Sequence, residues 1–158
     1  MTTDEEEIFP PIEPDDPEVL RHYLGQLRWR HAEEARAVDA GAFELAVHEG
    51  LRLCGPLRIN DPKEILRFLA LILLLTPAQK ASALHTTVVY RVLMQLSIWG
   101  ARKRMRFIYR FVVGRPAPDP EPDFGVWFIA DPQACPVSLP DVRKILFTAL
   151  PPVAPVVN

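Results

Sequence analysis

At 158 residues, the chain is long enough to bury a substantial core in one domain, and its 49% hydrophobic content excludes wholesale disorder. Its formal net charge is −2, although charge is sharply segregated along the sequence. Seventeen prolines are about twice the usual share, and they cluster in segments that we expect to be tails and connectors.

Residues 1–16 are acidic and rich in proline, with Ile8, Phe9 and Ile12 as the only sizeable apolar side chains. This composition predicts a disordered N-terminal tail. Two functional alternatives stay open. In the first, residues 8–12 are a short motif that docks on a partner. In the second, the tail folds back onto the basic part of the chain.

Residues 17–99 show helical periodicity and repeated helix-start signals. Asp16, Asp61 and Thr76 are each followed by proline, which combines an N-cap side chain with a residue suited to the first helical position. Residues 84–99 are ambiguous, because their apolar spacing suits a helix while their threonines and valines favour a strand. We predict a helix there, since no helix breaker interrupts it.

The segment 65–75 is apolar on nearly all sides, so we expect it to lie at the centre of the fold, with Leu69, Ile72 and Leu73 buried. It has eleven residues and contains Arg67, whereas a membrane-spanning helix needs about 20 residues. The sequence therefore predicts no transmembrane segment.

Residues 103–113 alternate between two sets of side chains, which is the period of a half-buried strand. A proline-rich connector, 115–123, leads to residues 124–130, which are apolar at every position except glycine. We predict an antiparallel hairpin over 103–130 that packs against the helices, with residues 57–59 as a candidate third strand.

Together these elements predict one helix-dominated α+β domain, with about five helices and a small antiparallel sheet. The globular domain spans residues 17–150 and consists of a helical part over 17–99, the hairpin and a short C-terminal helix over 139–150. Residues 151–158 form a second tail, because they are mostly proline and valine.

Charge is distributed unevenly along the chain. No carboxylate occurs between Glu64 and Asp119, a stretch with nine basic residues, whereas residues 1–64 carry fifteen acidic and seven basic residues. Such segregation predicts that the middle of the chain faces something anionic. The densest basic cluster consists of Arg102, Lys103, Arg104, Arg106 and Arg110.

In a strand, the four arginines of this cluster would point to one side with a repeat of about 6.6–7 Å, close to the phosphate repeat of a nucleic-acid strand. Trp99, Phe107 and Tyr109 are candidates for base stacking. Three roles stay open for the cluster: a solvated or self-masked face, a nucleic-acid-binding surface, and a surface for a protein partner or an anionic membrane.

The sequence offers no catalytic or cofactor motif. Cys54 and Cys135 are isolated, which indicates neither a disulfide framework nor a zinc site and favours reduced thiols in a cytoplasmic protein. The four histidines lack metal-site spacing, and neither phosphate-binding glycine motifs nor a nucleophile elbow occur. We therefore expect no metal, no cofactor and no catalytic residues.

These features predict a non-enzymatic interaction or assembly protein, a structural or adaptor component of a larger complex. Because both faces of the predicted strand 124–130 are apolar, we expect Val126, Trp127 and Phe128 to contact a protein partner or a second subunit. The alternative is a protein that binds nucleic acid or an anionic membrane surface, such as a capsid- or matrix-like component, through residues 102–110.

Overall fold

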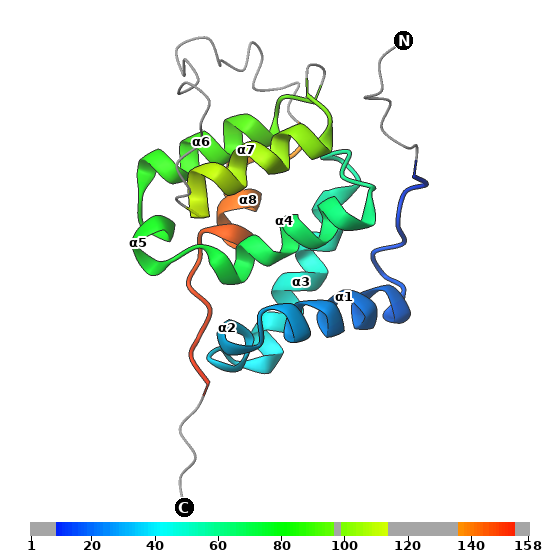
Figure 1. Ribbon diagram of the computed structural model, residues 1–158, viewed down its shortest axis with the longest axis vertical. Coiled ribbons are helices and arrows are strands. Elements are labelled where there is room, and N and C mark those ends of the chain that lie inside the picture. The colour runs from blue at the N-terminus through cyan, green and yellow to red at the C-terminus, as the bar shows by residue number, and fades with distance from the viewer. Residues whose placement is uncertain (1–8, 97–98, 114–135, 154–158) are drawn as a thin grey trace, which may run out of the picture.

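The computed structural model describes residues 9–96, 99–113 and 136–153. These residues form eight α-helices and no β-strand (Figure 1). The helices are α1 (Pro17–Arg30), α2 (Ala32–Arg36), α3 (Ala40–Cys54), α4 (Pro62–Leu74), α5 (Pro77–Lys80), α6 (Ala83–Leu93), α7 (Ala101–Val113) and α8 (Leu139–Leu146).

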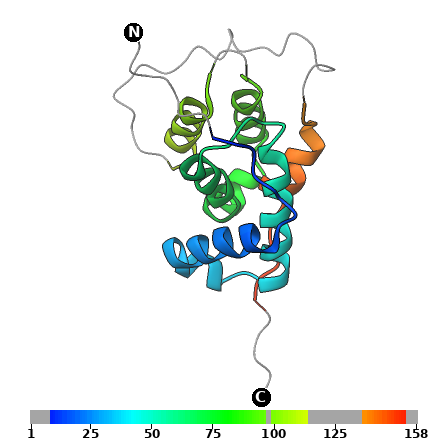
Figure 2. The same ribbon diagram turned by 90° about the vertical axis from the view of Figure 1, so that its right-hand side faces the viewer.

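The helix α4 is the centre of the molecule, because it contacts α1, α2, α3, α7 and α8. Figure 2 shows α4, α6 and α7 nearly end-on, with α1 crossing below them and α3 running along their side. Leu69 and Ile72 of α4 are completely or almost completely buried, as predicted, while Leu73 is half-buried. An element that is apolar all round thus takes the position with the most neighbours.

Short polar side chains fix where the helices begin, as the sequence predicts. Asp16 and Asp61 each accept a hydrogen bond of 2.9 Å from a backbone N–H in the first turn, and each is followed by proline. Thr76 and Gln79 form a reciprocal capping box. Ser138 caps α8, because its hydroxyl accepts the backbone N–H of Asp141 at 3.2 Å.

The predicted α+β fold is wrong in its β part. Residues 103–113 lie in the helix α7 rather than in a strand. Residues 57–59 form no strand: Leu57 and Arg58 end a turn over residues 55–58, Arg58 has a positive φ of 55°, and Leu57 and Ile59 are buried. Residues 124–130, the predicted partner strand, lie outside the described residues.

The periodicity of residues 103–113 fits two structures, which explains the error. Alternation was the feature that predicted a strand, but Ala101, Arg104, Met105, Ile108 and Val112 also recur at helical spacing, and all are buried on one face of α7. Arginine, lysine and methionine also favour helix by intrinsic propensity. For the ambiguous segment 84–99, by contrast, the predicted helix is correct as far as Leu93, where α6 ends, and too long beyond it.

Both ends of the described chain are attached to the helices. Ile12 packs against the core, and the Asp15 carboxylate contacts His48 at 3.1 Å and Arg52 at 3.0 Å on α3. After α8, the chain runs back to α2, where Pro152 forms an isolated antiparallel bridge with Val38. These contacts bring segments distant in sequence into one domain.

Candidate functional site

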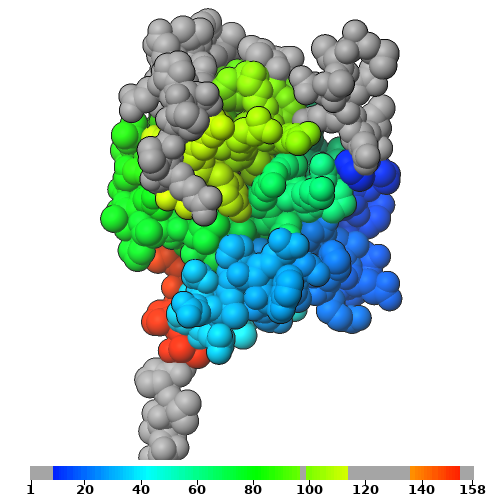
Figure 3. Space-filling view, in the orientation of Figure 1, coloured from blue at the N-terminus to red at the C-terminus, as the bar shows by residue number. Residues whose placement is uncertain are grey.

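The basic cluster of the sequence becomes the exposed side of α7. Arg102, Lys103, Arg106 and Arg110 are all exposed, and their spacing places them within about 100° around the helix axis. We call these four residues the basic face of α7. Figure 3 shows α7, in yellow-green, reaching the molecular surface beside α4. The basic side chains at positions 102, 106 and 110 follow one another at intervals of about 6 Å along the helix axis.

Arg104 does not belong to this face, although the strand prediction placed it with the other arginines. Its side chain is 1% exposed, and its guanidinium donates hydrogen bonds to the carbonyl oxygens of Leu93 (3.0 Å), Trp99 (3.1 Å) and Arg58 (3.4 Å). Leu93 is the last residue of α6, where carbonyls lack helical partners and carry partial negative charge. Arg104 is therefore a structural residue that ties three backbone segments together.

Aromatic side chains lie next to the basic face. The rings of Trp99 and Phe107 are 5.9 Å apart, and the Lys103 ammonium lies 5.0 Å from the centre of the Trp99 ring. Both aromatic residues are half-buried. Tyr109, the third aromatic candidate, is held by α4, since its hydroxyl donates to the backbone carbonyl of Arg67 at 2.8 Å.

The buried side chain of Glu64 is ion-paired with Arg67 on α4, and its carboxylate also interacts with the charge of Arg102 on the basic face. Burial raises the pKa of Glu64 above its ordinary value, while Arg67 and, more weakly, Arg102 act to lower it. In the described part of the chain, no carboxylate lies within 4 Å of Lys103 or Arg106. Their charges face outward.

Two features of α7 work against its own helical stability. The pairs 102–106 and 106–110 place like charges four residues apart, which costs about 0.2–0.5 kcal/mol per pair in an isolated helix. The first turn contains no acidic residue and three basic ones, which is unfavourable to the helix dipole. Packing of the apolar face of α7 against α4 and α6 offsets these costs. Departures of this kind from local rules are expected at functional surfaces.

The described residues show little that resembles a catalytic or metal centre. Among them, no three His, Cys, Asp or Glu side chains converge on a point that could hold a metal ion. Ser82 and His85 are in contact at 2.8 Å, but the Ser82 hydroxyl also accepts the backbone N–H of His85 and is the N-cap of α6. Cys54 is buried in the core, and burial raises the pKa of its thiol.

The predicted partner contacts Val126, Trp127 and Phe128 lie outside the described residues, so the structure places none of them. No helix in the described part of the chain has the length and apolar character needed to span a bilayer.

Sequence reasoning missed the structural role of Arg104. The signal for it was the helical spacing of Arg104 with Ala101, Ile108 and Val112.

Comparison with known proteins identifies no relative: no family model, no curated protein and no solved structure matches this chain. Function must therefore be inferred from the chain's own residues.

Proposed function

We propose that this chain is a non-enzymatic interaction protein that binds nucleic acid through the basic face of α7. The observation that carries this proposal is the outward placement of Lys103 and Arg106, with no carboxylate partner among the described residues. Cations arranged in a row on a helix suit the phosphates of a polyanion, and arginine can contact a phosphate through two hydrogen bonds.

The aromatic neighbours favour nucleic acid over an anionic membrane surface. Trp99 and Phe107 border the basic face, and base stacking on aromatic rings is the usual complement to phosphate contacts in single-stranded recognition. Lys103 already lies over the Trp99 ring, so a phosphate at Lys103 would bring its nucleotide close to this ring.

A salt titration tests the proposal. Binding of a fluorescent single-stranded oligonucleotide should weaken linearly on a log–log plot against salt concentration. The Lys103→Glu/Arg106→Glu variant should bind far more weakly, and its slope should fall by about 1.4 units if each side chain neutralises one phosphate. Its thermal stability should match or exceed that of the wild type, because the changes remove like-charge pairs and add an acid to the first turn of α7.

The matched control is Arg143→Glu/Lys144→Glu, which makes the same change in net charge on exposed residues of α8. It should retain most of the binding. Equal loss in both variants would mean that binding reflects net charge rather than the basic face. Binding to phosphatidylserine vesicles without binding to the oligonucleotide would replace nucleic acid with a membrane surface as the partner.

A further inference from the structure

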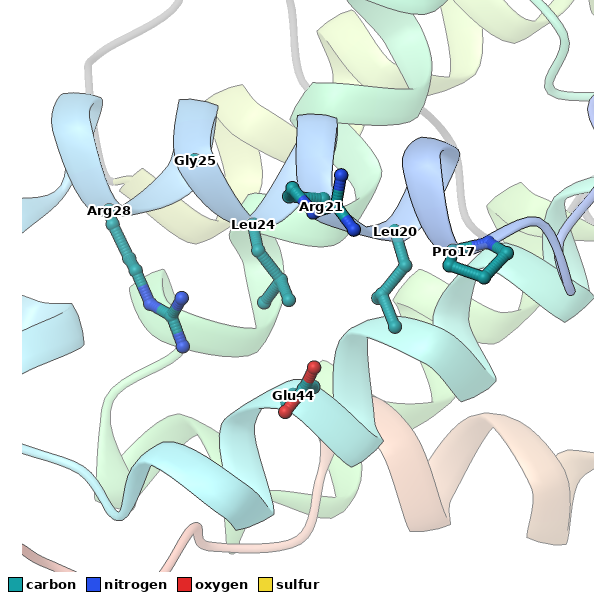
Figure 4. A pocket seen from close by; sticks show the side chains of 7 residues that line it. All are labelled: Pro17, Leu20, Arg21, Leu24, Gly25, Arg28 and Glu44. Atoms are coloured by element: carbon teal, nitrogen blue, oxygen red, sulfur yellow. The ribbon is translucent and has the colours of Figure 1, made fainter.

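A solvent-exposed groove of about 320 Å³ runs between α1 and α3. Figure 4 shows Leu20 and Leu24 pointing from α1 toward α3, with Glu44 on the α3 side. Gly25 and the flanking Arg21 and Arg28 complete the α1 wall. The groove therefore has an apolar floor and charged walls, and it lies on helices other than α7.

Gly25 is in the interior of α1, where the fold gives no reason for a glycine. Among the described residues, no heavy atom lies within 4 Å of a Cβ built at this position. Alanine would fit this space and would favour the helix more. A glycine on an exposed helix surface does allow another backbone to approach closely.

An exposed aromatic residue follows one turn later. Trp29 is 77% exposed, more than any other large hydrophobic residue that the structure describes. Arg21, Gly25 and Trp29 are spaced four residues apart, so they form one row along α1. Tryptophan and arginine are the residues that most often dominate the binding energy of protein interfaces.

The charges indicate what this surface binds. Arg21 and Arg28 form no salt bridge with any described carboxylate, and both line the groove. Glu44 on the α3 side is the one carboxylate that lines the groove, so its lining keeps a net charge of +1. The two arginines on the α1 wall complement an acidic partner.

We propose that the Arg21–Gly25–Trp29 row and the adjoining groove are a docking surface for an acidic amphipathic helix of a protein partner. Apolar side chains of that helix contact the half-buried Leu20, and its backbone approaches at Gly25. Trp29 becomes buried, and carboxylates of the partner pair with Arg21 and Arg28. This is helix-in-groove recognition, and it does not depend on nucleic-acid binding by α7.

The probe is a synthetic amphipathic helical peptide with leucines on one face and glutamates on the other. A second peptide, with lysines in place of the glutamates, is the matched control. Both are titrated into the full chain carrying Lys103→Glu and Arg106→Glu, so that the basic face of α7 cannot attract the acidic peptide. With 5-fluorotryptophan in the protein and Trp29→Phe for assignment, the fluorine resonance of Trp29 should shift with the acidic peptide and stay unchanged with the basic one.

Two variants locate the contact. Gly25→Gln should weaken binding of the acidic peptide about tenfold or more, because a side chain then occupies the point of close approach. Gly55→Gln is the matched control, since no described atom lies within 4 Å of its Cβ either, and it should bind like the parent protein. Arg21→Glu/Arg28→Glu should reverse the preference in favour of the basic peptide.

The proposal is overturned if both peptides bind equally, if neither shifts the Trp29 resonance, or if Gly55→Gln weakens binding as much as Gly25→Gln. It is also overturned if light scattering shows a dimer that Trp29→Ala dissociates, because the occupant would then be a second copy of this chain.

Discussion

Arg104 and Arg106 lie two residues apart in α7, and their environments are opposite. Arg104 is buried and donates to three backbone carbonyls, whereas Arg106 faces solvent. A buried guanidinium is stable only when its desolvation is offset by well-placed acceptors. Among the described residues, the acceptors are backbone carbonyls at the end of α6 and in two loops.

Replacing these arginines by methionine should separate the two roles. Arg104→Met leaves three carbonyls without their donor and should lower the free energy of unfolding by about 2–4 kcal/mol. Arg106→Met removes only an exposed charge and should change it by less than about 0.5 kcal/mol. Urea denaturation of both variants measures the difference. Similar losses in the two variants would contradict the structural role of Arg104.

Glu64 makes stability depend on pH. Burial raises the pKa of its carboxyl above 4.5 in the folded state, so the folded protein holds this proton more tightly than the unfolded chain. The resulting contribution to stability is fully present below pH 4.5 and is lost as the pH rises through the folded-state pKa. Glu64→Gln abolishes this titration.

We therefore expect the stability of the wild type, relative to Glu64→Gln, to fall as the pH is raised from about 4 across this window. Urea unfolding at a series of pH values measures the difference. Glu44→Gln makes the same chemical change at an exposed position and is the control. A difference between wild type and Glu64→Gln that is constant, or grows with pH, would show that the carboxyl is not destabilised by burial.

At the level of the elements, the sequence predicted helix starts well and the hairpin badly. N-cap residues such as Asp61 and Thr76 act on neighbours within a few residues, so the helix starts can be predicted from the sequence without knowledge of the fold. The assignment of residues 103–113 depended on which face is buried, and this is decided by packing against α4 and α6. The same packing decides that Arg104 lies inside and Arg106 outside, so the site was only partly predictable.

Gly25 of α1 and Gly50 of α3 provide a matched pair of helix positions. A Cβ at Gly25 meets no described atom, so Gly25→Ala should raise the free energy of unfolding by about 0.5–1 kcal/mol. A Cβ at Gly50 would lie 2.7 Å from Cδ2 of the buried Leu69, so Gly50→Ala should lower it by about 1 kcal/mol or more despite the gain in helix propensity. Thermal or urea unfolding of both variants measures these changes. Equal changes in the free energy of unfolding would contradict the packing described around Gly50.

At the scale of the whole molecule, charge can be compared only over the residues that the structure describes. The salt bridges between described residues all join groups within residues 15–67, including Asp15 with Arg52 and Glu64 with Arg67. None of these salt bridges involves Lys103 or Arg106 of the basic face of α7. Four of the five residues of the predicted basic cluster are exposed and Arg104 is buried, and that this part of the chain faces something anionic stays a prediction.

The return of the chain after α8 has a consequence for biosynthesis. Val38 and Pro152 are bridged although they lie 114 residues apart, and Lys80 donates hydrogen bonds to the carbonyls of both Ile72 and Thr148. On the ribosome, α1 to α4 emerge long before α8, which packs on α3, α4 and α6. The nascent protein therefore exposes the core surface that Ile145 and Leu146 cover only after α8 has been synthesised.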